Sequence, residues 1–371
     1  MGKALLDWFD AHKRPLPWRL RYDPYEVWIA EIMLQQTQME RGALYFERWM
    51  HRFPDVASVA GASQEALLKC WEGLGYYSRV RNLQKAAVLI MEKHGGRLPD
   101  DHASLLALPG IGEYTAGAIL SIAFNKPFAA IDANVERVFS RLFDIDSPIK
   151  SIEASDFIRH MANALMPEGQ ARDYNQALME LGALVCSRKP ACGICPLSRF
   201  CRARRLGIAT ERPVPGKKVQ YSDLEIVSGV LIYKGKLFMQ KRLDSGVWAG
   251  FWEFPGGRLE KDESPEQGVA REYLEETEFR VRIAQSLGSV RHAYTRYRIR
   301  MHCFILALEE TRGIRLDEEG FPVPVLHAAT QYRWLRQDEL ESEDYTLPAG
   351  HRKLLEAWAP LLRKAACCGN K

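Results

Sequence analysis

Two carboxylates that lie far apart in the chain have surroundings suited to acid–base chemistry. Glu31 stands in the segment WIAEIML, where apolar neighbours would exclude water and raise its pKa. Such a carboxyl holds a proton near neutral pH, as a general acid must. Asp132 precedes a segment with helically spaced apolar residues, so we expect it to cap that helix and to stay ionised. The alternatives are a surface or paired glutamate and a purely structural cap.

Two glycines in the segment LPGIGEY mark a tight turn before a helix. Gly110 and Gly112 suit a chain that bends sharply and approaches another molecule closely, and the apolar run from Tyr114 to Phe124 predicts a helix. The first turn of such a helix directs free backbone N–H groups outward, where they can bind phosphate. The alternative is that the glycines form only a turn.

Four cysteines within sixteen residues have the spacing of a metal centre. They follow the pattern Cys186-x5-Cys192-x2-Cys195-x5-Cys201. Four thiolates in one short loop suit a [4Fe–4S] cluster, whereas structural zinc more often has two paired CxxC or CxxH knuckles. Zinc and a loop without metal are the alternatives. Lys and Arg residues are interleaved with these cysteines, which makes the loop a candidate surface for phosphate contacts.

The composition is that of a soluble globular protein with more than one domain. The chain has 371 residues, 47% of them apolar, which allows two or three packed domains. The net charge is only +4, but the segment from Cys186 to Arg212 holds seven Lys or Arg residues and one acid, which favours a polyanion over a membrane. We find no signal peptide and no run of eighteen apolar residues, so we expect a cytoplasmic protein. Separately, we expect it to be a monomer.

The periodicity of apolar residues changes along the chain. Residues 1–205 carry helical patterns, including one over residues 25–38 that begins at the capping pair Asp23-Pro24. After a segment rich in proline, glycine and lysine, IVSGVLIY and KLFMQKR flank a Lys-Gly turn as a hairpin. We therefore expect an all-α domain followed by an α+β domain. The predicted boundaries are 1–205 for the helical domain, 206–222 for a linker, 223–362 for the second domain and 363–371 for a disordered tail with the thiols Cys367 and Cys368.

The segment LPGIGEYTAGAILSIAFNKPFAAIDANVERVF, together with the cysteine loop, resembles the endonuclease III superfamily of DNA glycosylases. With the second domain, the likeness points to the adenine glycosylases of that superfamily. It implies a helix-hairpin-helix at about residues 103–124 and a [4Fe–4S] cluster on the four cysteines at 186–201. Five residues separate the first two cysteines, whereas the family has six. We expect this difference to affect the path of the loop more than the presence of the cluster. Members that also cut the DNA backbone carry a Lys where this chain has Tyr114, so the Schiff-base nucleophile is missing.

The same resemblance implies roles for single residues. Glu31 would protonate the departing adenine and Asp132 would stabilise or trap the sugar cation, which is the logic of glycoside hydrolysis applied to an N-glycosidic bond. Tyr114 and Asn134 would support them. Because that bond cannot be reached inside a duplex, the target base must be flipped out. The implied contacts to DNA or substrate are Arg14, Trp18, Gln36, Thr37, Leu74, Tyr76, Gly110, Gly112 and Gln176.

Two of these contacts would enter the base stack. The resemblance places Gln36 and Tyr76 there, and Leu74 and Tyr76 form an apolar tip on a glycine-containing turn that could wedge between bases. The alternative is a packed aromatic loop.

The segment GGRLEKDESPEQGVAREYLEETEF resembles the Nudix box, G-x5-E-x7-REUxEExGU, where U is a bulky aliphatic residue. The residues in register are Gly257, Glu263, Arg271, Glu272, Glu275 and Glu276. Carboxylates at helical spacing can hold Mg²⁺ against a diphosphate. The sequence departs from the box at Tyr273, where an aliphatic residue is expected, and at Glu278, where Gly is expected. The resemblance implies a Nudix-like fold for the second domain.

In adenine glycosylases, a domain of this kind recognises 8-oxoguanine opposite the adenine. The family reads the lesion with a Phe-Ser-His loop, and the matching place here is Tyr294-Thr295-Arg296. Thr keeps a hydroxyl and Tyr keeps an aromatic face, whereas Arg in place of His is a departure. The alternative is an ordinary exposed turn between strands.

The expected function is that of a monofunctional glycosylase acting on double-stranded DNA that contains A:8-oxoguanine or A:G mispairs. One alternative is a glycosylase with backbone-lyase activity, against which Tyr114 argues. A second is a Nudix nucleotide diphosphatase with a DNA-binding domain. A third is a damage-binding protein without catalysis, against which the presence of both Glu31 and Asp132 argues.

Overall fold

The computed structural model describes residues 1–216, 221–243, 246, 248–294, 296–310, 313–341 and 345–368. The chain divides into two compact units. Unit 1 consists of residues 1–62 and 78–218, and unit 2 consists of residues 63–77 and 219–371. The confirmed fold is a helical domain followed by an α+β domain, with residues 63–77 grouped with the second unit.

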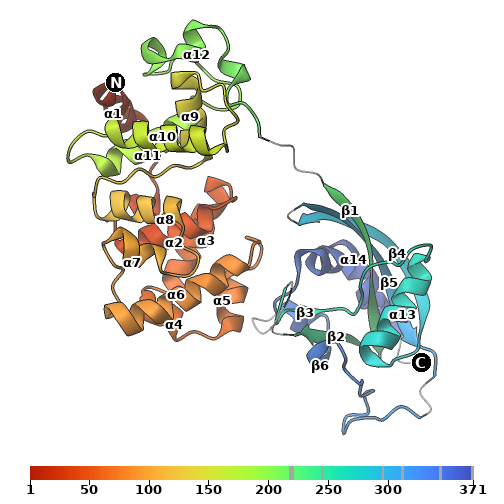
Figure 1. Cartoon of the computed structure of the whole chain (residues 1–371). Helices are drawn as coiled ribbons and strands as arrows, with labels where there is room; N and C mark the ends of the chain where they lie inside the picture. Colours follow the sequence, from red (N-terminus) through yellow and green to blue (C-terminus); the bar gives the residue numbers. More distant parts are fainter. Residues whose placement is uncertain are drawn as a thin grey trace. The chain divides into compact units, whose positions relative to one another are not determined.

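Unit 1 is built of helices, which Figure 1 shows in red to green. Its elements are α1 (Gly2–His12), η1 (Pro17–Arg19), α2 (Pro24–Leu34), α3 (Met39–Arg52), α4 (Val56–Ala60), α6 (Ser78–His94), α7 (His102–Leu106), α8 (Glu113–Ala118), η2 (Ile119–Ala123), α9 (Ala133–Phe143), α10 (Ile152–Ala164), α11 (Ala171–Leu184), η3 (Ser198–Phe200), α12 (Arg202–Arg205) and η4 (Ala209–Glu211). Helix α5 (Gln64–Trp71) belongs to unit 2. Among the described residues, no helix combines the length and apolar character needed to cross a membrane.

Apolar side chains of α1, α9, α10 and α11 form one core of unit 1. Phe9, Phe139, Tyr174 and Leu181 are fully or almost fully buried in it, and part of the cysteine loop packs against the same core. Burying side chains of this size contributes roughly 1.5–3 kcal/mol each. The core therefore holds the helix that starts at Asp132 and the cysteine loop in one packed body.

Helix α2 is buried around its whole circumference from Tyr25 to Met33. Asp23 caps its start by accepting hydrogen bonds from the backbone N–H groups of residues 25 and 26, as the Asp-Pro pair predicts. The prediction that this helix runs to residue 38 was wrong, because it ends at Leu34 and Gln36 takes a left-handed backbone conformation (φ 58°). The Arg79 guanidinium of α6 binds the carbonyls of Ile32, Met33 and Gln35, which satisfies this helix end.

The predicted helix-hairpin-helix is present as α7, a turn and α8. Gly110 adopts φ +82°, and a Cβ there would lie 2.8 Å from Asn82 Cβ, so the turn requires glycine. Helix α8 continues as the π-helical segment η2, a geometry common at functional sites. Helix α9 then begins at its cap Asp132, which accepts a hydrogen bond from Val135 N at 2.8 Å. The chain therefore presents Asp132 at the start of a helix, as predicted.

Six strands form one sheet in the described part of unit 2. Its elements are β1 (Ser222–Tyr233), β2 (Lys236–Arg242), β3 (Trp252–Glu253), α13 (Pro265–Thr277), β4 (Val281–Tyr294), β5 (Tyr297–Leu308), β6 (Ala329–Leu335), η5 (Asp338–Glu341) and α14 (Ala349–Cys368). The strand order is β3-β2-β1-β5-β4, with β6 paired to β2. β1 and β5 run parallel, and β4 and β5 form an antiparallel hairpin.

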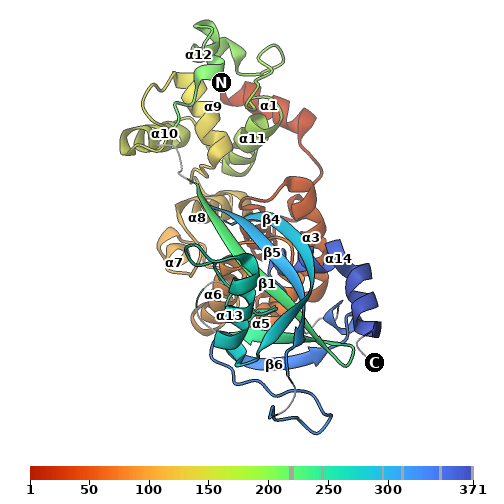
Figure 2. The same cartoon turned by 90° about the vertical axis from the view of Figure 1, so that its right-hand side faces the viewer.

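The two faces of this sheet are covered by different helices. Val227, Leu231 and Phe238 pack with α13, whereas Val230 and Met239 pack with α14. Because neighbouring strand residues point to opposite faces, this alternation buries both sides of the sheet. Figures 1 and 2 show α13 and α14 beside the sheet in two views. The sheet is therefore the centre of an α+β unit.

Two predicted boundaries differ from the structure. Helix α14 extends to Cys368, so residues 363–368 belong to a helix and not to a disordered tail. In the predicted linker, residues 209–211 form η4, and Val214 O accepts a hydrogen bond from Ile149 N at 3.1 Å. Proline content alone did not indicate that this segment follows the surface of unit 1.

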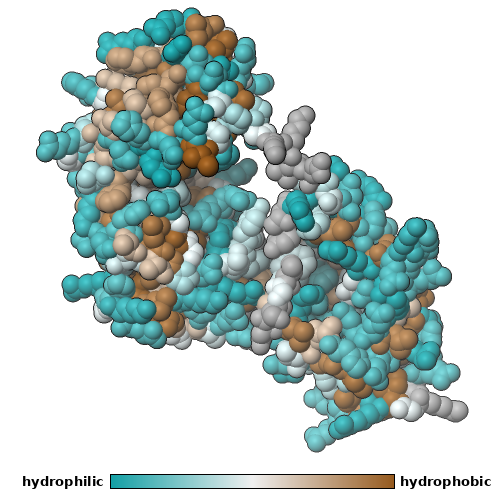
Figure 3. Space-filling view, viewed as in Figure 1, coloured by the Kyte–Doolittle hydropathy of each residue, from teal (hydrophilic) through white to brown (hydrophobic). Residues whose placement is uncertain are grey.

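The face in Figure 3 is largely hydrophilic with scattered apolar patches. The most exposed large apolar side chains include Leu20, Ile152 and Ile194. Single exposed apolar residues of this kind are ordinary on soluble domains.

Candidate active site

A cavity of about 760 Å³ lies in unit 1 between η1, the end of α2, α8, the start of α9 and α11. A volume of this size is typical of small-molecule sites. Nine of the residues predicted from the sequence line this one cavity: Arg14, Trp18, Glu31, Gln36, Thr37, Tyr114, Asp132, Asn134 and Gln176. The fold thus brings together side chains that are up to 162 positions apart, since Arg14 and Gln176 share the same wall.

Glu31 is buried, with 6% of its surface exposed. Burial raises its pKa to about 7, and the nearby charge of Asp132 acts in the same direction. A hydrogen bond from Tyr114 and the positive charge of Arg19 act in the opposite direction. A carboxyl with a pKa near 7 is protonated in a large fraction of molecules at neutral pH, which is the property required of a general acid.

Asp132 is held by two hydrogen bonds at the start of α9. Val135 N donates to its Oδ1 at 2.8 Å and Asn134 Nδ2 donates to its Oδ2 at 2.7 Å. These bonds lower its pKa, as expected for a helix cap, but burial outweighs them and the pKa is raised overall. The bonds fix the direction of the carboxylate, which lines the cavity.

Tyr114 connects α8 to the acid on α2. Its hydroxyl donates to Glu31 Oε2 at 2.5 Å. Burial and the neighbouring carboxyl groups of Glu31 and Asp132 raise the pKa of Tyr114 well above its usual value, so it remains a hydrogen-bond donor at neutral pH. This geometry gives Tyr114 the supporting position predicted for it.

Two charged residues of the cavity escaped the sequence analysis, Arg19 and Glu180. Arg19 Nε donates to Gln176 Oε1 at 2.8 Å and its other nitrogen lies 2.7 Å from Glu180 Oε1. Arg14 also binds Glu180, at 2.9 Å. The signal for Glu180 was available as a carboxylate amid the apolar pattern of α11, whereas Arg19 gave none.

The turn after α2 carries Gln36 and Thr37 into the same cavity. Gln36 is exposed and its left-handed backbone is unusual for a residue other than glycine. Strained positions of this kind concentrate at functional sites. The turn therefore has the geometry of a segment that presents a side chain to a ligand.

The two residues predicted to form a wedge, Leu74 and Tyr76, differ in their exposure. Tyr76 is exposed and also has a positive φ of 49°, but Leu74 is buried with 8% of its surface exposed. An exposed apolar tip at Leu74 is therefore not present in this structure. Gly110 and Gly112 lie in the hairpin turn and not among the residues that line the cavity.

The four predicted metal ligands surround a small cavity at the far end of α9. Cys186, Cys192, Cys195 and Cys201 all line it, together with Arg141. In the described part of the chain, no three His, Cys, Asp or Glu side chains converge on one ion. A [4Fe–4S] cluster takes one thiolate at each iron, so its ligands surround a body instead of converging on a point. This arrangement of four unpaired thiols fits that cluster.

Helix α9 connects the cluster loop to the cavity. Arg137 donates to the carbonyl of Cys186 at 2.8 Å and to Asn134 Oδ1 at 2.7 Å, and Asn134 in turn holds Asp132. One turn further along, the buried Arg141 lies 3.3 Å from Cys186 Sγ. The loop and the carboxylate are thus joined by a continuous series of hydrogen bonds.

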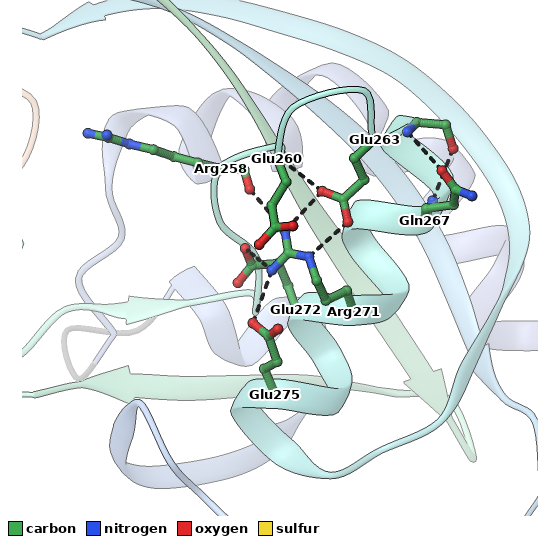
Figure 4. Close-up of polar contacts among 8 residues, drawn as sticks. Arg258, Glu260, Glu263, Gln267, Arg271, Glu272 and Glu275 are labelled. Atoms are coloured by element: carbon green, nitrogen blue, oxygen red, sulfur yellow. Dashed lines mark hydrogen bonds and ion pairs between the residues drawn. The ribbon is translucent and has the colours of Figure 1, made fainter.

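The Nudix-box residues lie in unit 2, and Figure 4 shows four of them, Glu263, Arg271, Glu272 and Glu275. Arg271 lies at the centre of the group, with nitrogens 2.8 Å from Glu263, 3.0 Å from Glu272 and 3.0 Å from Glu275. Glu276 is not part of this group. Burial and the neighbouring Glu253 raise the pKa of Glu276 to about 8, while Gln240 Nε2 donates to it at 2.9 Å.

Both departures from the Nudix box have a structural explanation. Tyr273 is fully buried, and its hydroxyl donates to Gly229 O at 2.7 Å. Glu278 ends α13 in the left-handed conformation (φ 59°) that glycine usually adopts there. The box is therefore kept in the fold, with Glu263, Glu272 and Glu275 paired to Arg271.

The predicted lesion-reading residues fall at the hairpin between β4 and β5. Tyr294 pairs with Tyr297 in the register of that hairpin. Thr295 lies outside the described residues. The role of these residues in reading the lesion stays a prediction.

Three segments match known protein families. Residues 29–160 match the HhH-GPD superfamily of base excision DNA repair proteins, residues 187–201 the iron-sulfur binding domain of endonuclease III, and residues 227–357 the NUDIX domain. A solved structure described as a thermostable thymine-DNA glycosylase covers 55% of this chain and 95% of its own, with 28% identity and a TM-score of 0.52. Fold and site thus define an iron–sulfur DNA N-glycosylase of the helix-hairpin-helix class with a C-terminal Nudix domain.

Sequence identity to curated relatives identifies the family within this class. The chain is 33% identical to the adenine DNA glycosylase of Rattus norvegicus over 83% of this chain and 70% of the relative. It is 34% identical to that of Arabidopsis thaliana, of whose length it spans 57%. The chain belongs to the adenine DNA glycosylase family.

Proposed function

We propose that this protein removes adenine from double-stranded DNA where the adenine is paired with 8-oxoguanine or guanine, and that it acts as a monomer. The observation that carries the proposal is that Glu31, with a pKa of about 7, and Asp132 line one cavity in unit 1. The adenine specificity rests on membership of the adenine DNA glycosylase family. The carboxyl pair supplies the chemistry that such a reaction needs.

Glu31 acts as the general acid. The C1′–N9 bond of the deoxyadenosine breaks, and its electron pair passes to the base while the Glu31 proton moves to a ring nitrogen of the adenine. Protonation makes the base a better leaving group. Tyr114 holds the carboxyl in place through its bond to Glu31 Oε2. The base must leave the duplex to reach this cavity.

Asp132 faces the sugar. As the bond breaks, positive charge develops at C1′, and the carboxylate stabilises it or bonds to it until the oxygen of a water molecule attaches there. The products are free adenine and an abasic site. Asn134 and the first turn of α9 keep the carboxylate in one direction.

The reaction is a simple hydrolysis without strand cleavage. A lyase needs an amine that forms a Schiff base with the sugar, and the matching position holds Tyr114, whose hydroxyl is engaged with Glu31. Borohydride added during turnover is expected to trap no covalent protein–DNA adduct. A trapped adduct in good yield would favour the bifunctional alternative.

The [4Fe–4S] cluster on the four cysteines organises a DNA-contacting loop and takes no part in bond cleavage. Six basic residues in and beside this loop are available for phosphate contacts: Arg188, Lys189, Arg199, Arg202, Arg204 and Arg205. The cluster loop also positions Asp132 through Arg137 and Asn134.

The C-terminal unit recognises the base opposite the adenine through the turn at residues 294–296. The alternative is a nucleotide diphosphatase, which needs carboxylates that hold a cation. Arg271 pairs with Glu263, Glu272 and Glu275, whereas Glu276 does not contact it. Lesion recognition as the role of this unit is supported by membership of the adenine DNA glycosylase family.

The decisive experiment is single-turnover base release from duplexes with A:8-oxoguanine, A:G and A:T pairs. We expect release from the first two and little from the third. Glu31→Gln should lower the rate on A:8-oxoguanine by a factor of about 10²–10⁴, because the amide has no proton to give. Full activity of Glu31→Gln would refute the assignment of the acid. Equal rates on A:8-oxoguanine and A:T would refute recognition of the opposite base.

A further inference from the structure

A carboxylate on α11, Glu180, lines the same cavity as Glu31 and Asp132. Its side chain is 1% exposed. Both of its oxygens are bound by guanidinium groups: Arg14 at 2.9 Å from Oε2 and Arg19 at 2.7 Å from Oε1. A buried charge of this kind persists only when it is paired.

The group formed by Glu180, Arg14 and Arg19 has one negative and two positive charges. Arg19 is the member whose charge reaches the proposed acid, since its guanidinium lowers the pKa of Glu31. Without a counter-charge, a cation beside a buried carboxyl strongly favours the ionised form. Ionised Glu31 could not donate a proton to a leaving base.

We propose that Glu180 is a charge-balancing and positioning residue for adenine release: its buried carboxylate offsets the charge of Arg19 and thereby keeps the proton on Glu31. This inference rests on the proposed role of Glu31. Glu180 itself acts through Arg19 and is not assigned contact with the reacting atoms.

Glu180 also fixes the orientation of its partners. Arg19 donates through one terminal nitrogen to the carbonyl of Arg14 at 3.0 Å and through Nε to Gln176 Oε1 at 2.8 Å. With its oxygen engaged, the Gln176 amide keeps one orientation, and its Nε2 lies 3.3 Å from Arg172 O. Loss of Glu180 would release Arg19 and with it the amide on the cavity wall.

The charged and titratable groups around the acid come from several elements. Tyr114 of α8, Asp132 at the start of α9 and Arg19 of η1 act directly on Glu31. Arg14 and Glu180 lie behind Arg19. Asp132 opposes ionisation of Glu31, whereas Tyr114 and Arg19 favour it. Glu180 is the negative partner of Arg19 in this group.

The test is the pH dependence of single-turnover adenine release by the intact, cluster-containing protein. The rate should fall at high pH as Glu31 loses its proton. Glu180→Gln, which removes the charge and keeps the shape, should move the midpoint of this fall to lower pH by about one unit. The rate of this variant should recover in part at pH 6. A role confined to folding would lower the rate equally at every pH.

Three further variants separate charge from shape. Glu180→Asp keeps the charge and should keep the wild-type midpoint even if the rate falls. Arg19→Gln should have a midpoint above that of the wild type, because the cation beside Glu31 is gone. The double variant Arg19→Gln/Glu180→Gln should have a midpoint at or above that of the wild type for the same reason. Glu153→Gln on the exposed side of α10 loses the same charge without contact to the site and should leave the midpoint unchanged.

Each outcome bears on one claim. An unchanged midpoint in Glu180→Gln overturns the charge-balancing role. If that variant does not fold, as thermal unfolding would reveal, an unchanged midpoint in Arg19→Gln overturns it instead. If Glu31→Gln keeps both the activity and the fall at high pH, the proposed function of Glu31 fails, and the shift in Glu180→Gln must then concern another group.

Discussion

The carboxyl of Glu31 has two protonation states, and its surroundings favour the neutral one. Burial is the main cause, and Asp132 adds to it, while Tyr114 and Arg19 hold the pKa to about 7. The site thus combines groups that raise the pKa of Glu31 with groups that lower it. Two predictions follow from this balance, one for rate and one for stability.

The rate of adenine release should depend on the protonated fraction of Glu31. It should fall tenfold per unit well above pH 7 as Glu31 loses its proton, and it should also fall at acid pH as Asp132, whose pKa is raised, gains one. Tyr114→Phe removes a hydrogen bond that favours the ionised carboxylate, so this variant should move the fall to higher pH. Single-turnover rates between pH 5 and 9 measure both effects. A shift to lower pH in Tyr114→Phe would contradict this account.

The free energy of unfolding should depend on pH, because the ionised form of Glu31 is unfavourable in its buried position. The pKa of Glu31 in the folded state, about 7, exceeds its ordinary 4.5, so the folded state binds more protons between these values. The stabilisation is complete below pH 4.5 and is lost as pH rises through 7. Glu31→Gln should therefore be more stable than the wild type at pH 8 by up to about 3 kcal/mol, and lack this gain at pH 4.5.

Urea unfolding of the helical unit at the two pH values measures this difference. Glu153→Gln, on an exposed part of α10, is the control and should show no such pH dependence. A Glu31→Gln variant no more stable than the wild type at pH 8 would mean that the buried carboxylate finds compensation elsewhere.

At the scale of elements, two close backbone contacts decide where Asp132 lies. Gly117 of α8 packs so closely on the loop before α9 that a Cβ there would lie 2.5 Å from Ala129 O. Gly182 of α11 packs on the first turn of α9, where a Cβ would lie 2.6 Å from Asn134 Cβ. These contacts leave α9 little freedom to shift.

Gly182→Ala should therefore displace Asn134 and the carboxylate that it holds. A displacement of about 1 Å can cost about 10²-fold in rate, so adenine release should fall by this order. Gly216→Ala is the matched control, because its Cβ would meet nothing within 4 Å. Equal activity of the two variants would show that α9 adapts without loss of catalysis.

At the scale of the whole molecule, the cysteine loop and the catalytic cavity belong to one packed unit. α9 spans the distance between them, with Asp132 at its start and Arg137 and Arg141 bonded to the loop. We therefore expect the cluster to stabilise the part of the protein that presents both the basic residues and the carboxylate.

Loss of one ligand should reveal this coupling. Cys195→Ser should reduce the bound iron and weaken binding to duplex DNA by about tenfold or more, because the basic residues lose their fixed positions. Cys303→Ala, in the core of unit 2, should keep the iron. Iron analysis and DNA titration at one fixed salt concentration measure both. Unchanged DNA affinity after loss of iron would refute a role for the cluster in ordering the loop.

The sequence by itself determined the order and type of the domains, the loop with four cysteines and nine of the residues that line the cavity. Periodicity and capping residues act over a few positions, so Asp23 and Asp132 could be recognised as helix caps from neighbouring residues alone. The Lys-Gly hairpin before β2 was likewise a local signal.

Only the tertiary structure decided which charges share the cavity. Arg19 and Glu180 meet because η1 and α11 pack together, and their mutual neutralisation has no counterpart in any local pattern. The early end of α2 also depends on a distant residue, Arg79, whose guanidinium binds the last carbonyls. Burial and pairing of charges are properties of contacts between segments far apart in the chain, and they set the proton affinity of Glu31.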